Sequence, residues 1–325
     1  MKAAIVKGAG KTPVYDEFPE PAPQPGLELI TVRASALSQF TKSRAAGTHY
    51  SAEGGFPTVA GSDGVGKTQD GRRVYFALPE EPYGAMAEKS VVRSQQCIEL
   101  PDDLDDITAA AIANPGMSAW CALEQRAHLK PGETVLINGA TGTAGRLAVQ
   151  LARYLGAAKV IATGRNEAEL EEVKSLGADV VIPFALGALQ PSGSRAYEDA
   201  LKEQFATGID VVVDYLWGES AKTVIVAIAK AVEDGTPVRF VHVGGASREE
   251  NIELPGAALR SSAITLMGSG VKSVRLQGLI EAIKNVFQAV APAHLQIATR
   301  PVPLTEVEQV WDHAGGKPRV VFTLG

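Results

Sequence analysis

The sequence predicts an α/β protein that combines a doubly wound parallel sheet of the Rossmann type with a smaller β-rich domain. A chain of 325 residues is longer than a single hydrophobic core usually accommodates, so two domains are expected. The opening part has short β-like runs broken by glycine, proline and charged residues. From Thr134 onward, apolar strands alternate with amphipathic helices, which produces a parallel sheet covered on both faces.

The opening part is expected to form an antiparallel, barrel-like domain over residues 1–115. Its predicted strands include Leu29–Arg33, Arg73–Phe76 and Ser90–Val92. A β-like tail, Arg319–Phe322, is expected to return to this domain, so residues 271–325 complete it. Arg319 is predicted to lie in a solvated turn, or to reach a cofactor if the tail folds back.

Residues 116–270 are expected to form the sheet of alternating strands and helices. The predicted strands are Val135–Asn138, Lys159–Thr163, Val180–Ile182, Ile209–Val213, Val238–Val243 and Ile264–Met267. The predicted helices between them are Ala144–Leu155, Glu167–Leu176, Tyr197–Phe205 and Ser220–Val232, and Leu276–Val290 follows. Crossovers between parallel strands are right-handed, which gives a doubly wound sheet.

Composition limits the function classes. The formal net charge is −6 and no cluster of Lys and Arg is present, which argues against nucleic-acid binding. No stretch approaches the roughly 18 apolar residues of a membrane span. Two distant cysteines, Cys97 and Cys121, provide neither a disulfide framework nor a structural zinc site, so a reducing cytoplasm is expected.

A glycine-rich turn lies between the first predicted strand and helix of the sheet. It reads Ala140-x-Gly142-x-x-Gly145, with alanine in place of the first glycine of the dinucleotide-binding pattern. Gly142 would let the backbone approach a diphosphate, and Gly145 would let the helix pack closely. The helix start at Thr143 and Ala144 would supply N–H groups to the anion. The alternative is a tight turn that binds nothing.

The end of the next strand favours NADPH over NADH. An NAD site usually has an acidic residue about 20 positions on, which bonds the ribose 2′-hydroxyl. Here the strand ends Thr163-Gly164-Arg165, with no acidic side chain. Arg165 could pair with a 2′-phosphate, which a carboxylate would repel. Alternatively, Arg165 is a solvated residue at the start of a helix.

Several segments resemble the medium-chain dehydrogenase/reductase superfamily, and within it the zinc-independent quinone oxidoreductase branch. They are Met1–Ala4, Asn114–Trp120, Lys130–Leu136, Gly156–Ala157, Gly208–Asp214 and Val243–Ala246. The resemblance implies a GroES-like substrate domain, a Rossmann domain and an active site in the cleft between them. It also implies hydride transfer from NADPH to a small molecule, and commonly a homodimer that pairs through strand Ile264–Met267.

The zinc-containing members of that superfamily differ from this sequence. They carry a cysteine ligand near the position of Ser38, a Gly-His-Glu near Gly61–Asp63, and a lobe of four closely spaced cysteines. This chain has none of these, so no ligand set for a catalytic zinc is expected.

Two residues are candidates for catalysis. Tyr50 lies where some relatives that reduce activated double bonds carry a proton-donating tyrosine; it could equally line the pocket without acid–base work. Ser38 could bond a ribose or a substrate carbonyl, or could simply cap a loop.

The resemblance adds further candidate cofactor contacts. They are Asn114, Gly244, Gly245, Gly268 and Ser269, and for the glycines the alternative role is turn geometry. The connection Pro183–Ser194 is longer than usual on the adenine side, and it either covers the cofactor or is an exposed loop.

Three functions remain open. The leading hypothesis is an NADPH-dependent reductase of quinones or conjugated carbonyls. The second is an enone or enoyl-thioester reductase in which Tyr50 donates the proton. The third is a non-catalytic NADPH-binding protein that acts as a sensor or a structural component.

Overall fold

A computed structural model describes residues 1–50, 55–186, 191–313 and 316–325. Contacts within the chain divide it into two compact units. Unit 1 comprises residues 1–114, 283–290 and 297–325, and unit 2 comprises residues 115–282 and 291–296.

Unit 2 contains a six-stranded parallel sheet with the strand order β11-β10-β9-β12-β13-β14. Its strands are β9 (Thr134–Asn138), β10 (Lys159–Gly164), β11 (Val180–Pro183), β12 (Val211–Asp214), β13 (Pro237–His242) and β14 (Ala263–Gly268). The order reverses between β9 and β12, which is the doubly wound arrangement. The predicted fold class is therefore confirmed for this sheet.

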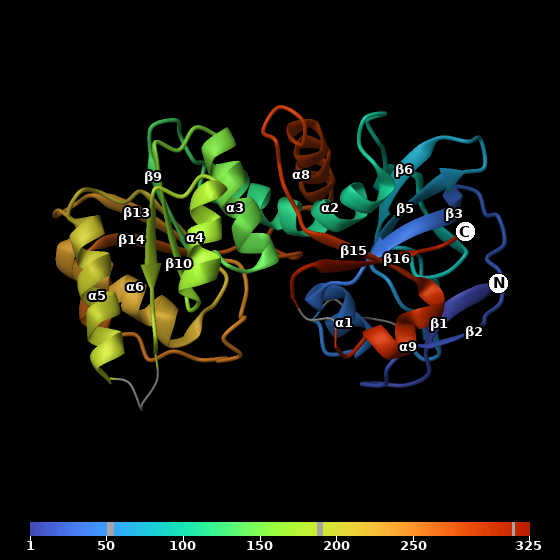
Figure 1. Cartoon of the computed structure of the whole chain (residues 1–325), viewed down its shortest axis with the longest axis horizontal. Helices are drawn as coiled ribbons and strands as arrows, with labels where there is room; N and C mark the ends of the chain where they lie inside the picture. Colours follow the sequence, from blue (N-terminus) through green and yellow to red (C-terminus); the bar gives the residue numbers. More distant parts are fainter. Residues whose placement is uncertain (51–54, 187–190, 314–315) are drawn as a thin grey trace. The chain divides into compact units, whose positions relative to one another are not determined.

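Helices cover both faces of the sheet. They are α3 (Thr143–Tyr154), α4 (Glu167–Ser175), α5 (Pro191–Phe205), α6 (Gly218–Ala231) and the short α7 (Gly256–Arg260). Figure 1 shows α3 and α4 on one side of the sheet and α5 and α6 on the other. This double cover explains why the central strands are apolar throughout rather than alternating with polar residues.

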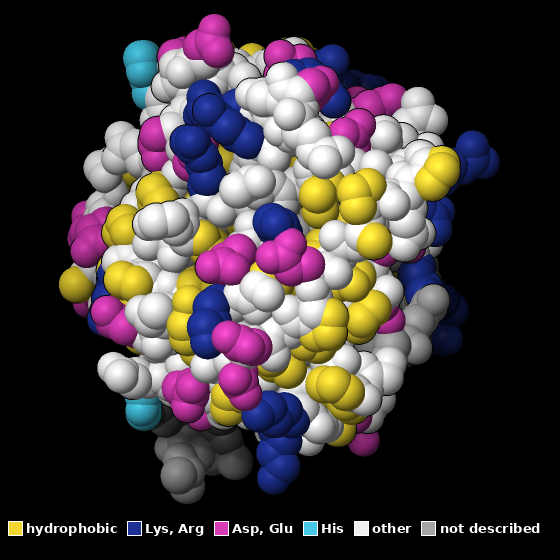
Figure 2. Space-filling view, turned by 90° about the vertical axis from the view of Figure 1, so that its right-hand side faces the viewer, with side chains coloured by type: hydrophobic (Ala, Val, Ile, Leu, Met, Phe, Trp, Pro, Cys, Tyr) yellow, Lys and Arg dark blue, Asp and Glu magenta, His cyan; other side chains and the backbone are white. Residues whose placement is uncertain are grey.

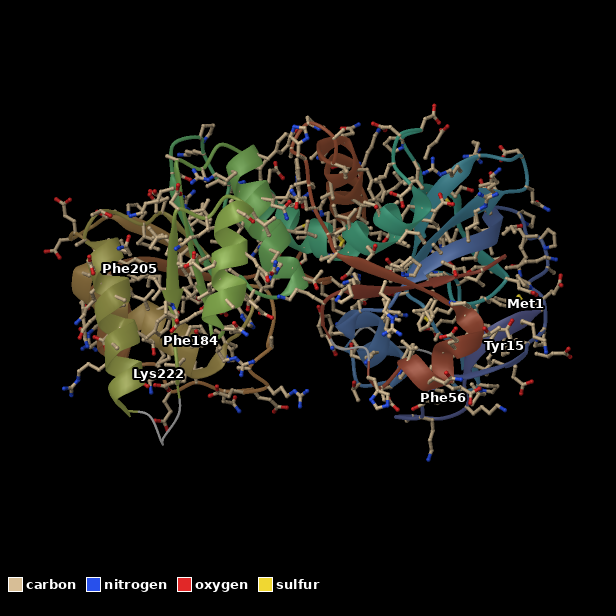
Figure 3. The ribbon with its side chains drawn as sticks, in the orientation of Figure 1. Met1, Tyr15, Phe56, Phe184, Phe205 and Lys222 are labelled. Carbon is tan, nitrogen blue, oxygen red and sulfur yellow. The ribbon has the colours of Figure 1, made fainter. Side chains whose placement is uncertain are left out.

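The core on the α5–α6 side is built from large side chains. Phe184 follows β11 and Phe205 ends α5, and both are buried in a cluster with Leu136, Val212 and Phe240 (Figure 3). Burying one such side chain contributes roughly 1.5–3 kcal/mol.

One long helix is missing from the sequence prediction. Helix α2 (Asp106–Trp120) contains Pro115 and continues into a π-helical turn, Cys121–Arg126. Pro115 and Gly116 in the middle of a helical pattern predict that the helix breaks there, because proline lacks the backbone N–H that a helix uses as a donor. Here most residues of the first half of α2 are buried, and tertiary packing overrides the local preference.

Unit 1 is a β-rich unit with two sheets. A seven-stranded sheet runs β15-β16-β3-β5-β6-β8, with β7 pairing to β3, and a three-stranded sheet runs β2-β1-β4. The strands are β1 (Lys2–Val6), β2 (Val14–Glu17), β3 (Leu27–Ala36), β4 (Thr58–Val59), β5 (Asp63–Thr68), β6 (Arg73–Ala77), β7 (Lys89–Arg93), β8 (Cys97–Glu99), β15 (Thr299–Pro303) and β16 (Arg319–Thr323). Its short helices are α1 (Gln39–Ala45) and α9 (Val307–Val310), and α8 (Leu276–Ala289) has residues in both units.

The end of the chain completes the larger sheet of unit 1. Strand β16 pairs antiparallel with β3 and parallel with β15. Arg319, which begins β16, is only 7% exposed, so the expectation of a solvated turn is wrong. The sheet buries it because its neighbours on the strand, Val320 to Phe322, pack into the core.

The surface of unit 1 mixes charges of both signs. Figure 2 shows acidic and basic side chains interspersed with apolar ones on the face it presents. Ion pairs such as Lys7–Asp16 and Lys89–Glu20 account for part of this mixture. In the described parts of the chain, no helix combines the length and the apolar character needed to cross a membrane.

A buried polar network ties together the carboxyl ends of the strands in unit 2. Asn138 Nδ2 donates to Asp214 Oδ1 at 2.8 Å, which joins β9 to β12. Asn138 Oδ1 accepts from Thr163 at 2.7 Å, from Ser220 at 2.9 Å and from Tyr197 at 3.2 Å. Burial raises the pKa of Tyr197 to about 12, so its phenol stays a donor at physiological pH.

We predict that Asn138→Ala destabilises the protein by about 3 kcal/mol or more, because each buried group left unsatisfied costs roughly 1–3 kcal/mol. Urea denaturation measures the free energy of unfolding. The control is Asn251→Ala at an exposed position, for which a change within about 0.5 kcal/mol is expected. Equal effects of the two substitutions would contradict the role of the network.

Candidate functional site

The turn between β9 and α3 ends in an uncapped helix start. Gly142 is the N-cap residue of α3, with φ −72° and ψ 165°, and among the described residues the helix start has no side-chain capping hydrogen bond. Helices usually satisfy these N–H groups with a capping side chain or a ligand. The first turn of α3 therefore offers backbone donors and the positive end of the helix dipole to an anion.

The two glycines of this turn have different surroundings. A Cβ on Gly145 would lie 2.3 Å from the carbonyl oxygen of Gly139, so only glycine lets α3 pack this closely on the turn. A Cβ on Gly142 would meet its nearest neighbour at an ordinary 3.8 Å. The fold itself therefore requires Gly145, whereas the open space beside Gly142 suits a ligand that approaches the backbone.

The end of β10 places Thr163, Gly164 and Arg165 next to that turn. Thr163 is fully buried, and its hydroxyl donates to Asn138 at the end of β9. This bond helps to fix the start of the turn. A Cβ on Gly164 would lie 2.6 Å from the Thr141 methyl group. Arg165 is exposed and makes no ion pair with any residue that the structure describes. Its guanidinium group is thus available to an anion that binds beside the end of β10.

The predicted contacts on the other half of the sheet also lie at its carboxyl edge. Gly244 N donates to the carbonyl oxygen of Asp214, and Ser269 N donates to that of His242 at 2.8 Å. Gly268 ends β14, and its carbonyl accepts from Arg126. The structure thus places four predicted segments at the carboxyl ends of the strands of the six-stranded sheet: Gly142–Gly145, Thr163–Arg165, Gly244–Gly245 and Gly268–Ser269. Asn114 belongs to α2 in unit 1.

Sequence reasoning missed the residues that support this edge. Asp214 is fully buried and accepts from His242 Nδ1 at 2.9 Å and from the Trp217 backbone at 3.1 Å. Trp217 has φ +62°, a strained conformation for a non-glycine residue, and its ring lies 4.4 Å from that of His242. The sequence did show Asp214 at the end of an apolar strand, but that position alone does not identify the groups with which it forms hydrogen bonds.

Unit 1 holds the catalytic candidate Ser38 in a chain of hydroxyl groups. Ser38 Oγ accepts from Thr41 N at 2.9 Å as the N-cap of α1, and it lies 2.9 Å from Thr41 Oγ1. Thr41 Oγ1 lies 2.9 Å from Ser62 Oγ, which donates to Asp63 Oδ1 at 2.7 Å. Tyr75 OH donates to the other oxygen of Asp63 at 3.0 Å. Ser38 therefore caps a helix and also belongs to a longer polar chain.

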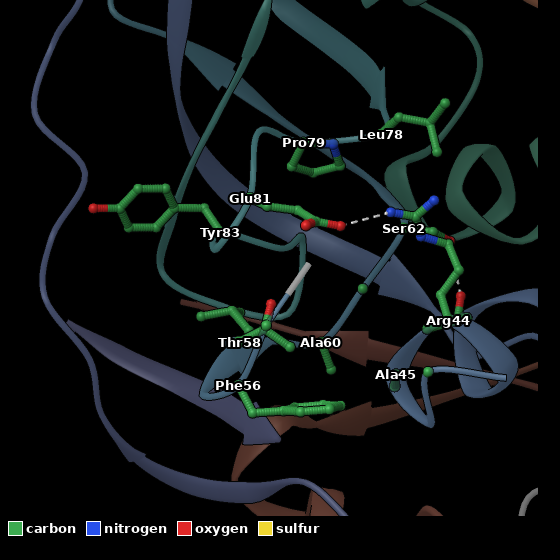
Figure 4. Close-up of a pocket in the computed structure, with 15 residues that line it drawn as sticks. Arg44, Ala45, Phe56, Thr58, Ala60, Ser62, Leu78, Pro79, Glu81 and Tyr83 are labelled. Atoms are coloured by element: carbon green, nitrogen blue, oxygen red, sulfur yellow. Dashed lines mark hydrogen bonds and ion pairs between the residues drawn. The ribbon is translucent and has the colours of Figure 1, made fainter. Parts of the chain in front are cut away.

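A pocket of unit 1 lies beside these linked hydroxyl groups (Figure 4). Thr41 and Ser62 form part of its wall, and Phe56, Val59 and Leu78 supply apolar surface. An ion pair of 3.1 Å between Arg44 and Glu81 lies at one side. The pocket thus combines an apolar wall with a few polar groups, as small-molecule sites usually do.

Tyr50, the other catalytic candidate, is 57% exposed. Its ring lies 4.1 Å from that of His49, which in turn contacts Phe40 edge-on. It does not line the pocket of Figure 4. The segment that follows, 51–54, lies outside the described residues.

The long connection between β11 and α5 is described in part. Phe184, which follows β11, is buried, and α5 begins at Pro191. Residues 187–190 lie outside the described part of the chain.

Among the residues that the structure describes, no three His, Cys, Asp or Glu side chains come together in a way that could hold a metal ion. Cys97 and Cys121 are free thiols, and burial raises the pKa of each to about 12.

Comparison with known proteins agrees with this architecture. Residues 144–290 match the family model described as "Zinc-binding dehydrogenase". The probable NADPH-dependent quinone reductase tdiC of Emericella nidulans is 29% identical, with 99% of each chain aligned. The 2-haloacrylate reductase of a Burkholderia species is 29% identical over 66% of each chain. A mycobacterial quinone oxidoreductase shares the fold over 100% of both chains, with a TM-score of 0.82 at 21% identity.

The family model, the quinone reductase relative and the shared fold support the predicted place of this chain in the medium-chain dehydrogenase/reductase superfamily. Within that superfamily they support the zinc-independent quinone oxidoreductase branch.

We predict that Gly145→Ala and Gly142→Ala have opposite consequences. Gly145→Ala should lower the free energy of unfolding by about 1–3 kcal/mol, the usual cost of overpacking. Gly142→Ala should leave stability unchanged but weaken NADPH binding about tenfold, or about 1.4 kcal/mol. Urea denaturation and titration calorimetry measure the two quantities. Unchanged NADPH affinity in Gly142→Ala would argue against a diphosphate at this turn.

Proposed function

We propose that the protein is an NADPH-dependent oxidoreductase that transfers a hydride to a quinone or another conjugated carbonyl without zinc. The observation that carries this proposal is the uncapped start of α3 beside Gly142, with the cation of Arg165 at the neighbouring strand end. The quinone reductase and 2-haloacrylate reductase relatives support the same class of reaction.

The residues at the sheet edge fit a nicotinamide dinucleotide. Backbone N–H groups at Thr143 and Ala144 would bond the diphosphate, and Arg165 would pair with the 2′-phosphate. Gly244 and Ser269, on the other half of the sheet, would then contact the nicotinamide end. When bound, the reduced nicotinamide supplies the hydride, while the protein supplies orientation and a site that excludes water.

The pocket of unit 1 is our candidate for the acceptor site. A planar conjugated acceptor would find an apolar surface at Phe56 and hydroxyl groups at Thr41 and Ser62. The alternative with Tyr50 as proton donor draws support from the haloacrylate reductase relative, which acts on an activated double bond by its name.

Steady-state assays test the proposal directly. The purified protein should oxidise NADPH in the presence of quinones or enones, with little turnover when NADH replaces NADPH. The measurement is loss of absorbance of the reduced nicotinamide across a panel of quinones, enones, aldehydes and acyl thioesters. Tight NADPH binding without turnover on any of them would support the non-catalytic alternative instead.

The matched variant is Arg165→Ala. Loss of a charge-assisted pair with the 2′-phosphate should raise KM for NADPH about tenfold and leave KM for NADH unchanged. An equal change for both cofactors would contradict the role of Arg165.

We further propose a homodimer formed through β14. This strand is at the edge of the sheet in unit 2, and Leu266 on it is 40% exposed. An exposed, apolar edge strand invites pairing with another strand, and a two-fold axis would pair β14 with its mate. We place the protein in the cytoplasm, in keeping with its two free cysteines.

Light scattering at micromolar concentration should give the mass of a dimer for the wild type and of a monomer for Leu266→Lys. A charge at a buried apolar edge is costly, so the equilibrium should shift toward separate chains. The control is Glu203→Lys on α5, which packs near β11 at the opposite edge of the sheet. A monomeric wild type would contradict the proposal.

A further inference from the structure

The hydroxyl chain of unit 1 connects the pocket to a buried carboxyl group. Ser62 lies at the junction, because it lines the pocket and also donates to Asp63 Oδ1 at 2.7 Å. Asp63 itself is 4% exposed and does not line the pocket. Any exchange between this carboxyl and a molecule in the pocket would therefore pass through Ser62.

The sequence resemblance implies that zinc-containing relatives carry a cysteine and a His-Glu pair near the positions of Ser38, Ser62 and Asp63. The structure brings these three positions together through Thr41, with 2.9 Å on either side of its hydroxyl. Where zinc is bound, a metal stabilises the negative charge on a substrate oxygen. Here the same positions supply hydroxyl groups and a carboxyl group, which can move protons.

Asp63 faces one neutral phenol and one cation. Tyr75 of β6 donates to Oδ2, and Arg319 of β16 is buried nearby. The remaining contact from β3 is Ser35, whose hydroxyl donates to the backbone carbonyl of Asp63. Burial raises the pKa of the Asp63 carboxyl, against the opposing effects of Ser62, Arg319 and Tyr75. Burial also raises the pKa of Tyr75, which therefore remains a phenol.

Hydroxyl rotation lets the protonation state of Asp63 set the direction of the Ser62 hydrogen. When Asp63 is ionised, it accepts the Ser62 hydrogen, and none is left for the pocket. When Asp63 is protonated, it donates to Ser62 Oγ, and Thr41 can donate to the same oxygen. The hydrogen of Ser62 is then free to point into the pocket.

We propose that Asp63, acting through Ser62, is the proton source for the acceptor bound in the pocket. This inference rests on the proposed reductase function. A hydride added to a conjugated carbonyl leaves a negative charge on the carbonyl oxygen. The Ser62 O–H bond breaks as a new O–H bond forms on that oxygen, and the Asp63 proton passes to Ser62 Oγ. Asp63 ends ionised and regains a proton from water through the same chain after the product leaves.

Asp63→Asn tests this assignment, because asparagine keeps a hydrogen bond to Ser62 but has no proton to give. We expect kcat with an enone to fall about 10²-fold or more, the usual contribution of a general acid. In the wild type, kcat should decline as pH rises and Asp63 loses its proton, whereas the Asp63→Asn profile should be flat. NADPH affinity, measured by fluorescence titration, should be unchanged.

Two further variants complete the test. Ser62→Ala breaks the path and should lower kcat as much as Asp63→Asn does, with Asp63 and Tyr75 intact. Asp70→Asn, at an exposed aspartate in a hairpin of the same unit, should leave kcat and its pH profile unchanged.

The outcomes separate this inference from the proposed function. A wild type that turns over no acceptor would overturn the reductase itself. An active wild type with normal kcat and pH profile in Asp63→Asn would overturn the proton source alone, even if that variant is less stable. Loss of enone turnover in Tyr50→Phe, with Asp63→Asn unaffected, would assign the proton to Tyr50 instead.

Discussion

The hydrogen bond between Asn138 and Asp214 is the constraint on which the carboxyl edge of the unit 2 sheet depends, where we propose that NADPH binds. It fixes the ends of β9 and β12 on either side of the point where the strand order reverses. Asp214 also accepts from the Trp217 backbone and from His242, so the turn into α6 and the end of β13 are held by the same carboxylate. A binding edge made of backbone groups has no side chains of its own to order it, and the buried network supplies that order.

A buried carboxyl group organises each unit, but the two differ in what surrounds them. Asp214 is surrounded by N–H donors, and its oxygens are fully occupied. The carboxyl oxygens of Asp63 are bonded by two hydroxyl groups, those of Ser62 and Tyr75, and both can rotate or exchange hydrogens. Fixed donors make a rigid support, whereas hydroxyl groups make a path along which protons can move. This contrast is the physical reason why a structural role suits the first carboxylate and a chemical role the second.

Much of the fold of unit 2 was predictable from sequence, because its apolar strands and amphipathic helices alternate along the chain with clear periodicity. Helix α2 was not, since Pro115 and Gly116 contradict a helix locally and only packing decides it. The glycine-rich turn between β9 and α3 could be predicted because its residues are adjacent in the sequence. The partners of Asp214 and the hydroxyl groups that join Ser38 to Asp63 could not be predicted. Their decisive links, Thr41–Ser62 and Asn138–Asp214, join residues 21 and 76 positions apart and depend on strand register.

The sequence resemblance implies that zinc-containing relatives carry metal ligands near Ser38 and Asp63, where this chain has a serine and an aspartate. A metal ion provides fixed positive charge, so it stabilises an oxyanion without a proton. Serine in place of a ligand cannot do this, and neutral hydroxyl groups alone give modest stabilisation in a pocket that already contains the Arg44–Glu81 pair. Charge neutralisation by a proton is the remaining route, and it requires a group that is protonated when the acceptor is reduced. A carboxyl group buried behind a serine suits that role, because burial raises the pKa of Asp63 against the opposing effect of Arg319, while Ser62 links the carboxyl group to the pocket.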